Sequence, residues 1–305
     1  MGLSYLKATL ESGLYGTGGN APTVSTDGIK VQTFDYSVDR GALKDDTTDN
    51  YFTSAAYGGA LMVSGSIDSA WRPTSMSPLL TSVMGTPAAG VYTLGEPIPA
   101  VIQIGEKVGT VEKARDFYGV GVKSVEFTFE AKEFVKAKWD FLASEPRDAT
   151  YDTAVTYPVE DPLVFWRASL DIGGTAIYSK SVSLTIDRAL DDGQFVLGNF
   201  KLYRLVRTGV TDVSGTLGVT EEQVDEIDRA MYGSTSGTSI PADNPLGNGT
   251  LTITCLKVGG TAGATFVLPV KYNVTSNSVD GVGEFEKQIE FFIVGATSAM
   301  TITVA

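Results

Sequence analysis

Carboxylates are the side chains of this sequence that could do chemistry. The chain of 305 residues has 36 aspartates and glutamates, 23 lysines and arginines, and no histidine. Two carboxylates at a fixed separation can hydrolyse a glycoside, and a cluster of them can bind calcium. The absence of histidine excludes Ser-His-Asp and Cys-His catalysis and most zinc sites. Because no spacing singles out one pair of acids, the sequence predicts no catalytic residue and no enzyme.

The two acid-rich segments do not have the spacing of a calcium loop. DDTTDN (45–50) and DDG (191–193) lack the alternating ligands and the glutamate at position twelve of an EF-hand. The single cysteine, Cys255, lies in the strand pattern LTITCLKV and is typical of a small buried residue. We therefore expect no metal ion and no cofactor.

The net charge of −13 opposes electrostatic capture of nucleic acid, which needs patches of lysine and arginine. The first twenty residues, MGLSYLKATLESGLYGTGGN, contain no apolar core of a signal peptide. No apolar run is long enough to cross a membrane. We expect a protein that is made in the cytoplasm and contacts no membrane.

The elements that position the acids are strands with one apolar face. In KSVEFTFEAKEF, Val125, Phe127 and Phe129 alternate with polar residues, and SVSLTID and KQIEFFIV alternate in the same way. The 34 glycines and the lack of long helical patterns favour a mainly β fold. The acids that we expect on the wet faces of these sheets are Glu126, Glu130, Asp140, Asp187 and Glu290.

Four patterns recur in the same order along the chain. VSG begins at Val63 and again at Val213, an offset of 150 residues. VQTFDYSVDR (31–40) resembles YSKSVSLTIDR (178–188) at an offset of 148, and both end in Asp-Arg. AVIQIGEKVG (100–109) resembles LTITCLKVGG (251–260), and EFVKAKWDFLA (133–143) resembles GEFEKQIEFFIV (283–294). We interpret these repeats as two homologous β-sandwich or barrel domains.

The repeats set the expected boundaries. We place an N-terminal arm at 1–24, the first domain at 25–145, a linker at 146–164 and the second domain at 165–305. The linker has turn formers, charges and prolines in SEPRDATYDTAVTYPVEDP (144–162).

Each VSG precedes a segment with a helical pattern, PTSMSPLLTSVMG and TEEQVDEIDRAMYG. In the second, Thr220 and Gln223 form a capping box and Gly233 is placed to end the helix. A helix of about three turns is not stable alone, so its apolar stripe must close a β core. The residues expected to make these core contacts are Leu79, Leu80, Val83, Val224, Ile227 and Met231.

Two long loops occupy equivalent places in the two repeats, GALKDDTTDNYFTSAAYGG (41–59) and ALDDGQFVLGNFKLYRLVR (189–207). Long loops in compact domains are usually functional or disordered. The apolar residues of the second indicate a partner surface or an extended hairpin. The candidate contact residues are Asp45, Asp46, Asp49, Tyr51, Phe52, Asp191, Asp192, Phe195 and Phe200.

Several stretches together resemble the major tail tube proteins of long-tailed viruses of bacteria or archaea, in the subgroup with two fused tube domains. They are LESGLYGT (10–17), DPLVFWRASLDIGGTAIYSKSVSLTIDRAL (161–190), VSGTLGV followed by a helix, and the last strand pattern FEKQIEFFIVG.

The resemblance implies a structural virion protein whose trimeric, pseudo-hexameric rings stack into the tail tube and conduct viral DNA to the host cell. It implies that inner strands close into a ring-wide barrel and that the long loops, arm and linker stack the rings. The acids would line the lumen and repel DNA, which passes without specific binding. The implied partners are other copies of the chain and tail proteins such as the tape measure, terminator and distal tail proteins, assembled in the host cytoplasm.

Other interpretations remain open on the sequence. A distal-tail or head–tail joining protein with tube-like domains would share these patterns. An extracellular β-sandwich adhesin or carbohydrate-binding module would need a signal peptide. A type VI secretion tube protein has a single domain, against which the repeat counts.

Overall fold

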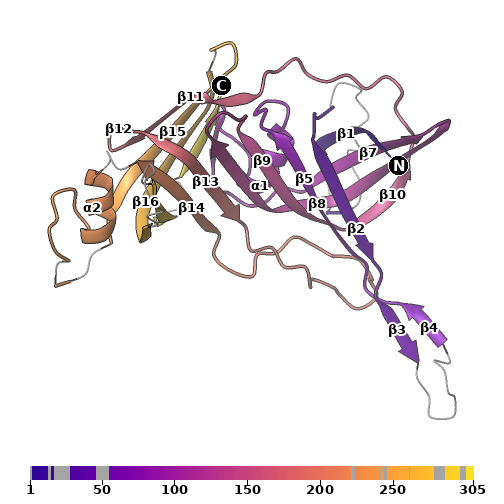
Figure 1. Ribbon diagram of the computed structural model, residues 1–305. Helices are drawn as coiled ribbons and strands as arrows, with labels where there is room; N and C mark the ends of the chain where they lie inside the picture. The colour runs from indigo at the N-terminus through magenta and orange to yellow at the C-terminus, as the bar shows by residue number, and fades with distance from the viewer. Residues whose placement is uncertain are drawn as a thin grey trace.

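The computed structural model describes residues 2–12, 15–16, 28–45, 55–220, 224–240, 242–243, 246–260, 262–277, 286–295 and 300–305. The fold is mainly β, as the alternating patterns predicted. In the described part of the chain, sixteen strands are joined in one hydrogen-bonded sheet, two more form a separate hairpin, and two short helices lie against the sheet (Figure 1).

Eight strands form a continuous antiparallel layer in the order β16-β17-β14-β13-β8-β9-β5-β2. The first half of the chain supplies β2 (Thr33–Asp39), β5 (Met62–Ala70), β8 (Val111–Glu130) and β9 (Lys136–Ala143). The second half supplies β13 (Ser179–Asp187), β14 (Asp212–Thr220), β16 (Ala262–Asn277) and β17 (Glu286–Ile293). We call this layer the eight-stranded layer.

Two long strands carry the chain from this layer into a second one. β8 and β16 each contain an irregularity in their pairing, between Val122 and Ser124 and between Tyr272 and Val274. Beyond it, β8 pairs with β7 (Ala100–Val108) and β10 (Glu145–Ala149). The same part of β16 pairs with β15 (Asn248–Lys257) and β18 (Thr301–Val304). The remaining strands are β1 (Gly2–Leu10), which pairs with β7, β6 (Val91–Thr93), which pairs with β18, and β11 (Leu163–Ile172), which lies between β15 and β12 (Thr175–Ile177).

The N-terminal residues are part of this second layer. Residues 2–10, expected in an arm, form β1, which pairs with β7 from Gly2 to Leu10. Leu6 is fully buried, and the buried Lys7 ammonium lies 2.8 Å from the Asp152 carboxylate. This ion pair attaches β1 to the connection between the halves.

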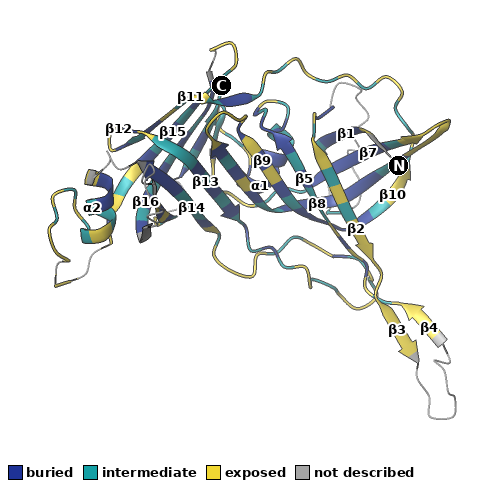
Figure 2. Cartoon of the chain, in the orientation of Figure 1, coloured by how far each residue is buried: buried dark blue, intermediate teal, exposed yellow. Residues whose placement is uncertain are grey.

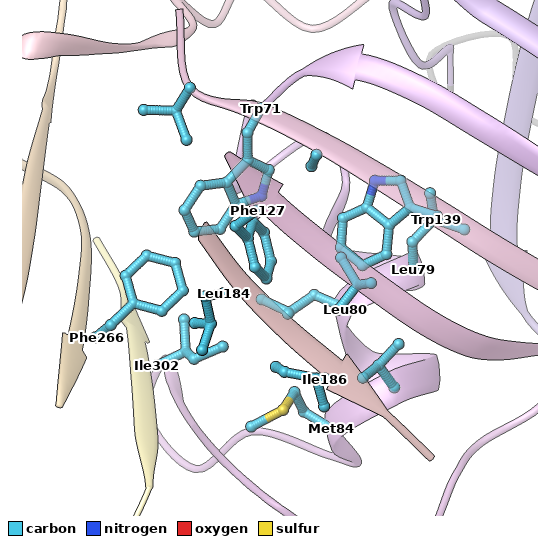
Figure 3. Packing of buried hydrophobic residues seen from close by; sticks show 14 of the residues in the cluster. Trp71, Leu79, Leu80, Met84, Phe127, Trp139, Leu184, Ile186, Phe266 and Ile302 are labelled. Carbon is cyan, nitrogen blue, oxygen red and sulfur yellow. The ribbon is translucent and has the colours of Figure 1, made fainter. Parts of the chain in front are cut away.

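One apolar core runs through both halves of the chain. Trp71 and Phe127 from the first half have ring centroids 4.7 Å apart, and each lies 5.3 Å from the ring of Phe266 on β16 (Figure 3). Leu184 and Ile186 of β13 belong to the same buried cluster. The halves are therefore packed together through side chains as well as through the sheet.

The two helices rest on equivalent strands. α1 (Ser77–Met84) contacts β8, and α2 (Val224–Tyr232) contacts β16. Gly85 and Gly233 follow them with positive φ angles of 96° and 78°, and the Gly233 N–H donates to the carbonyl of Arg229, as in a glycine-terminated helix. The expected capping box at Thr220 and Gln223 lies outside the described side chains.

The expected helix contacts differ between the halves. Leu79, Leu80 and Val83 are fully buried, and Ile227 is 5% exposed, whereas the side chain of Val224 lies outside the description. Met231 is a correction, because it is 40% exposed. The buried face of α2 is instead centred on Glu226 and Ile227, where the Tyr272 hydroxyl donates to the Glu226 carboxylate at 3.3 Å.

The two long connections take different forms. In 41–59, β3 (Ala42–Asp45) and β4 (Ala55–Gly58) form a hairpin that projects from the body and is exposed (Figures 1 and 2). Its Asp46, Asp49, Tyr51 and Phe52 lie outside the described residues, as does the side chain of Asp45. The connection from β13 to β14 instead lies along the first half, where the Leu61 N–H donates to the Phe200 carbonyl at 2.7 Å.

Candidate assembly site: a polar sheet face and two open strand edges

The five candidate acids lie on one face of the eight-stranded layer. The pairing Thr185↔Glu126 joins β13 to β8, and Thr216↔Glu290 joins β14 to β17. Paired residues share a face and alternate residues along a strand return to it, so Glu130, Asp140 and Asp187 share this face too. Glu126, Glu130 and Glu290 are exposed, whereas Asp140 and Asp187 are half-buried. We call this surface the polar face.

Acidic residues outnumber basic ones on the polar face. The register adds four aspartates, one each from β5 and β14 and two from β2, to the five candidates. Among the described side chains, the acids are Asp35, Asp39, Asp68, Asp212, Glu126, Glu130, Asp140, Asp187 and Glu290, and the bases are Lys136, Lys138 and Lys271. The surface is therefore hydrophilic with an excess of negative charge.

Hydroxyl groups fill the space between these charges. The Ser124 hydroxyl donates to the Asp140 carboxylate at 3.1 Å, and the Thr33 hydroxyl donates to Asp68 at 2.8 Å. The hydroxyls of Ser183 and Thr216 lie 2.8 Å apart. Small hydroxyl side chains keep this face wet without providing apolar contact area.

The two halves meet where β13 pairs with β8. This ladder runs from Ser181↔Glu130 to Asp187↔Ser124. Residues 124–128 of β8 also pair with β9 on their other side. Both sides of β8 are therefore satisfied by main-chain hydrogen bonds at this position. We call the β13–β8 ladder and its flanking contacts the internal joint.

The pairing register of one half repeats in the other. Thr33↔Asp68 between β2 and β5 corresponds to Ser181↔Gly218 between β13 and β14. Gly65↔Phe141 between β5 and β9 corresponds to Gly215↔Phe291 between β14 and β17. The irregularities of β8 and β16 also stand at equivalent positions. Two four-stranded arrays, β8-β9-β5-β2 and β16-β17-β14-β13, thus have the same strand order and register.

Each end of the eight-stranded layer presents an open edge. Among the described strands, β2 pairs with β5 alone. Within the described ranges, residues 274–277 of β16 pair with β17 alone, because the pairing of β16 with β15 extends only to Lys271 of β16. Val38 on β2 is 38% exposed, although it belongs to the apolar face of its strand. Unpaired edges of this kind are sites for pairing with another chain.

Arg188 lies at the internal joint and is completely buried. Its backbone N–H donates to the Lys123 carbonyl at 2.8 Å, and its Nη2 donates to the Gly95 carbonyl at 2.5 Å. Gly95 in turn donates to the carbonyl of Met84, the last residue of α1. Burial, with the neighbouring Arg207 as a second cause, lowers the pKa of the Arg188 guanidinium. Arg188 therefore connects β13 of the second half to the helix end of the first.

Charged pairs flank the internal joint on both sides. The Arg207 guanidinium lies 2.9 Å from the Glu96 carboxylate, and Lys201 forms an ion pair with Glu145. Burial favours the neutral form of Glu145, but hydrogen bonds from Lys201 and Arg147 outweigh it and hold the pKa of this carboxyl below its usual value. Both pairs join the β13–β14 connection to the first half.

Glu160 fastens the connection between the halves to the turn before α1. Its carboxylate accepts hydrogen bonds from the Ser75 hydroxyl at 2.7 Å and from the backbone N–H groups of Ser75 and Thr74 at 2.8 and 3.0 Å. Burial alone would raise the pKa of Glu160, but these hydrogen bonds hold it below the usual value. The role of Glu160 is not visible in the sequence, because its partners lie 85 residues away.

Neither described helix is long and apolar enough to cross a membrane. Across the described ranges, no three Cys, Asp or Glu residues are grouped as a metal site would need. The candidate loop residues Asp192 and Phe200 are exposed, and Asp191 and Phe195 are half-buried. The Asp191 carboxylate accepts hydrogen bonds from Gly193 and Gln194, so it stabilises its own turn.

The two open sheet edges are surfaces through which a layered β protein can pair with other chains. Residues 3–282 match the family described as phage tail tube protein. The chain belongs to this family, and the resemblance of its sequence to tail tube proteins is confirmed. No curated protein matches the chain. As a structural component of a phage tail, it assembles with further copies of itself and with other tail proteins.

Arg188 is a buried residue of the internal joint that reasoning from the sequence did not select. The signal was present, because both strand patterns end in Asp-Arg at the same offset. Without the structure, nothing distinguished these arginines from ordinary surface residues.

Proposed function

We propose that three copies of this chain close into a pseudo-sixfold ring, and that stacked rings form a tail tube through which viral DNA passes. The observation that carries this proposal is the repeated array of four strands. The internal joint places the second array beside the first. Repeating the same spatial relation between neighbouring arrays would place a further array beside each open edge. Three chains would then supply six arrays around one axis.

Closure of the ring would satisfy the open edges. An exposed edge of a sheet pairs promiscuously, and a closed barrel has no edge. The eight-stranded layers of the three chains would become one continuous barrel. Closure also gives the sheet one face towards the lumen and one face towards the outside, because a sheet that closes into a ring must curve in one direction.

We assign the polar face to the lumen of this ring. An acidic wall repels phosphates within a Debye length of about 8 Å at physiological salt. A basic wall would release counterions from DNA and bind it tightly. The predicted acids Glu126, Glu130 and Glu290 are exposed on this face, as are Asp35, Asp39 and Asp212, so these are the side chains that DNA would meet.

The β3–β4 hairpin is our candidate for contacts between rings. It projects from the body (Figure 1), and Leu43 and Tyr57 on it are largely exposed. The exposed Phe200 and Leu197 on the β13–β14 connection are a second candidate. Head-to-tail contacts that do not close generate a filament, which is the geometry of a tube.

Electron microscopy of the purified protein tests the proposal directly. We expect rings or tubes with a central hole, and native mass spectrometry should give a ring of three times the chain mass of 32.3 kDa. Single rings that never stack would favour a distal-tail or head–tail joining role. A protein that stays monomeric at high concentration would contradict ring formation.

A charge reversal tests the assignment of the polar face. In a virus carrying Glu126→Lys and Glu130→Lys, we expect intact tubes and impaired DNA delivery, because lysines would bind the phosphates that must slide past. Tail length by microscopy and infectivity by plaque count are the two measurements. Lys113→Glu is the matched control, because Lys113 is an exposed residue on the part of β8 that pairs with β7 in the second layer. Unchanged infectivity of the double variant would show that these residues do not line the lumen.

A further inference from the structure

We propose that the internal joint is the template for the joint between chains. In this proposal, β2 of one copy pairs with residues 274–277 of β16 in a second copy, in the register that β13 takes on β8. Arg40 of the first copy then becomes buried, as Arg188 is in the chain. The inference deepens the proposed ring, on which it rests, by specifying the two edges, their register and one anchoring residue.

The register follows from pairings that the chain already contains. The β2–β5 and β13–β14 ladders equate Thr33 with Ser181, an offset of 148 residues (181 − 33). The pairing with β9 and β17 equates Ser124 with Val274, an offset of 150 (274 − 124). Transferring the pairs Asp187↔Ser124 and Thr185↔Glu126 to the open edges therefore places Asp39 opposite Val274, and Ser37 opposite Ser276, of the second copy.

The apolar face of β2 is unfinished in the single chain. Val182, Leu184 and Ile186 of β13 are at most 1% exposed. Their counterparts on β2 are Phe34 and Tyr36, which are partly buried, and Val38, which is 38% exposed. These side chains have the alternation of a core strand, but among the described strands β2 has a pairing partner, β5, on one side only. A second copy on the free side would complete the cover.

α2 lacks the cover that α1 has. Leu80 and Met84 of α1 lie in one buried cluster with Leu184 and Ile186 of β13 (Figure 3). α2 stands at the opposite end of the layer from β2, away from any other array (Figure 1). At the offset of 148, Met231 corresponds to the fully buried Val83, yet it is 40% exposed. In the ring, the neighbour's β2 would cover Met231.

The two Asp-Arg turns have the same local geometry. The Asp187 carboxylate accepts a hydrogen bond from the Ala189 N–H at 2.7 Å, and the Asp39 carboxylate accepts one from the Gly41 N–H at 2.8 Å. Ala189 and Gly41 have φ angles of 48° and 49°. Arg40 and Arg188 thus leave their strands along equivalent paths. Arg188, which has a neighbouring array beside it, is buried, whereas Arg40, which has none in the single chain, is exposed.

The chemistry of the Arg188 contact identifies what Arg40 would bind. Arg188 donates to the carbonyl of Gly95. The N–H of Gly95 in turn donates to the carbonyl of Met84, the last residue of α1. Backbone carbonyls at and beyond a helix end attract a guanidinium, because the helix dipole is negative there. We expect Arg40 to donate to a backbone carbonyl in the segment that follows α2 of the second copy.

Cysteine pairs test the register. Ser37→Cys with Ser276→Cys should give disulfides between chains, and a non-reducing gel should show covalent dimers and trimers from purified rings. Thr185→Cys with Glu126→Cys is the matched positive control, because the same pairing exists within one chain and should give a disulfide inside the monomer. Ser37→Cys with Thr275→Cys is the negative control, since adjacent residues point to opposite faces. The natural Cys255 is buried.

The outcomes separate this inference from the proposed ring. Rings that cross-link through 37 and 276 support both. Rings that cross-link in another register, or not at all although the internal control forms, overturn this inference and leave the proposed ring intact. A protein that forms no rings without substitutions overturns both.

Arg40→Ala tests the anchoring residue. We expect the concentration needed for half of the chains to assemble to rise about tenfold, the scale of a central arginine at an interface. The melting temperature of the unassembled chain should stay unchanged, because Arg40 is exposed there. Lys113→Ala removes an exposed charge far from the joint and should assemble normally. Assembly of Arg40→Ala at the unchanged concentration would overturn the role of Arg40.

Discussion

The internal joint and the two open edges are built from equivalent strands in different surroundings. At the joint, Ile186 is fully buried and Arg188 reaches a backbone carbonyl of the other half. At the open edge, the equivalent Val38 is 38% exposed and Arg40 lies in solvent. The strands have the same register and turn geometry. They differ in the connection that follows them and in whether a second array stands beside them.

The covalent connection explains why one joint forms within the single chain. Residues 150–162 link the halves, so the second array is held at high effective concentration beside the first. Glu160 and Asp152 fasten this connection to the first half. No such tether holds a second copy, so the outer joints would depend on protein concentration. A chain can therefore fold first and assemble afterwards.

The largest expected effect is at the internal joint. Ile186→Asp places a carboxylate in the core, and we expect it to destabilise the fold by about 4 kcal/mol or more. Val38→Asp, at the equivalent position on the open edge, should cost under about 1 kcal/mol in the single chain. Chemical denaturation followed by circular dichroism measures both.

For ring formation, Val38→Asp is the more informative of these two substitutions. Val38→Asp should fold and fail to form rings, whereas Ile186→Asp should fail to fold. Equal destabilisation by the two substitutions would contradict the view that the edge is open in the unassembled chain.

A smaller effect is expected at the connection. Glu160→Ala removes a carboxylate that is 5% exposed and three hydrogen bonds, and we expect a loss of about 2–3 kcal/mol at neutral pH. Because folding lowers the pKa of Glu160 below its usual 4.5, this contribution is fully present above that value. It is lost as the pH falls through the folded-state pKa.

The pH dependence is measured by denaturation of the native chain and of Glu160→Gln between about pH 7 and pH 3. The difference in stability between them should shrink towards the acid end. A difference that grows as the pH falls would mean that folding raises the pKa of Glu160.

The smallest expected effect sharpens the comparison of the helices. Val83→Ala should cost about 1–2 kcal/mol, because it leaves a cavity in a fully buried site. Met231→Ala should cost under about 0.5 kcal/mol in the single chain, because Met231 is exposed. In assembled rings, the melting temperature should respond to both substitutions. An unchanged ring stability for Met231→Ala would mean that no neighbour covers α2.

Local patterns predicted the parts of the fold that depend on near neighbours in the chain. The alternation in KSVEFTFEAKEF placed Val125, Phe127 and Phe129 in the core, where they are fully buried. The glycines after both helical patterns lie at the helix ends. These features follow from backbone periodicity and from the tolerance of glycine for positive φ.

Local sequence patterns did not predict the features that depend on distant parts of the chain. Residues 2–10 pair with β7, about a hundred residues later, so their strand has no local signal of its partner. Met231 fits an apolar stripe, but the buried face of α2 is set by the contact between Glu226 and Tyr272. Arg188 and Glu160 act through groups that only the folded chain brings near.

The sequence by itself determined that this chain is a mainly β protein with polar strand faces and repeated strand patterns, and that it belongs with phage tail tube proteins. Periodicity and order along the chain are local properties, so they can be read directly. Only the tertiary structure decided that the candidate acids share one continuous face and that two edges of the sheet stay open. Both facts depend on which strands pair and in what register, and pairing across a hundred residues is settled by packing of the whole chain.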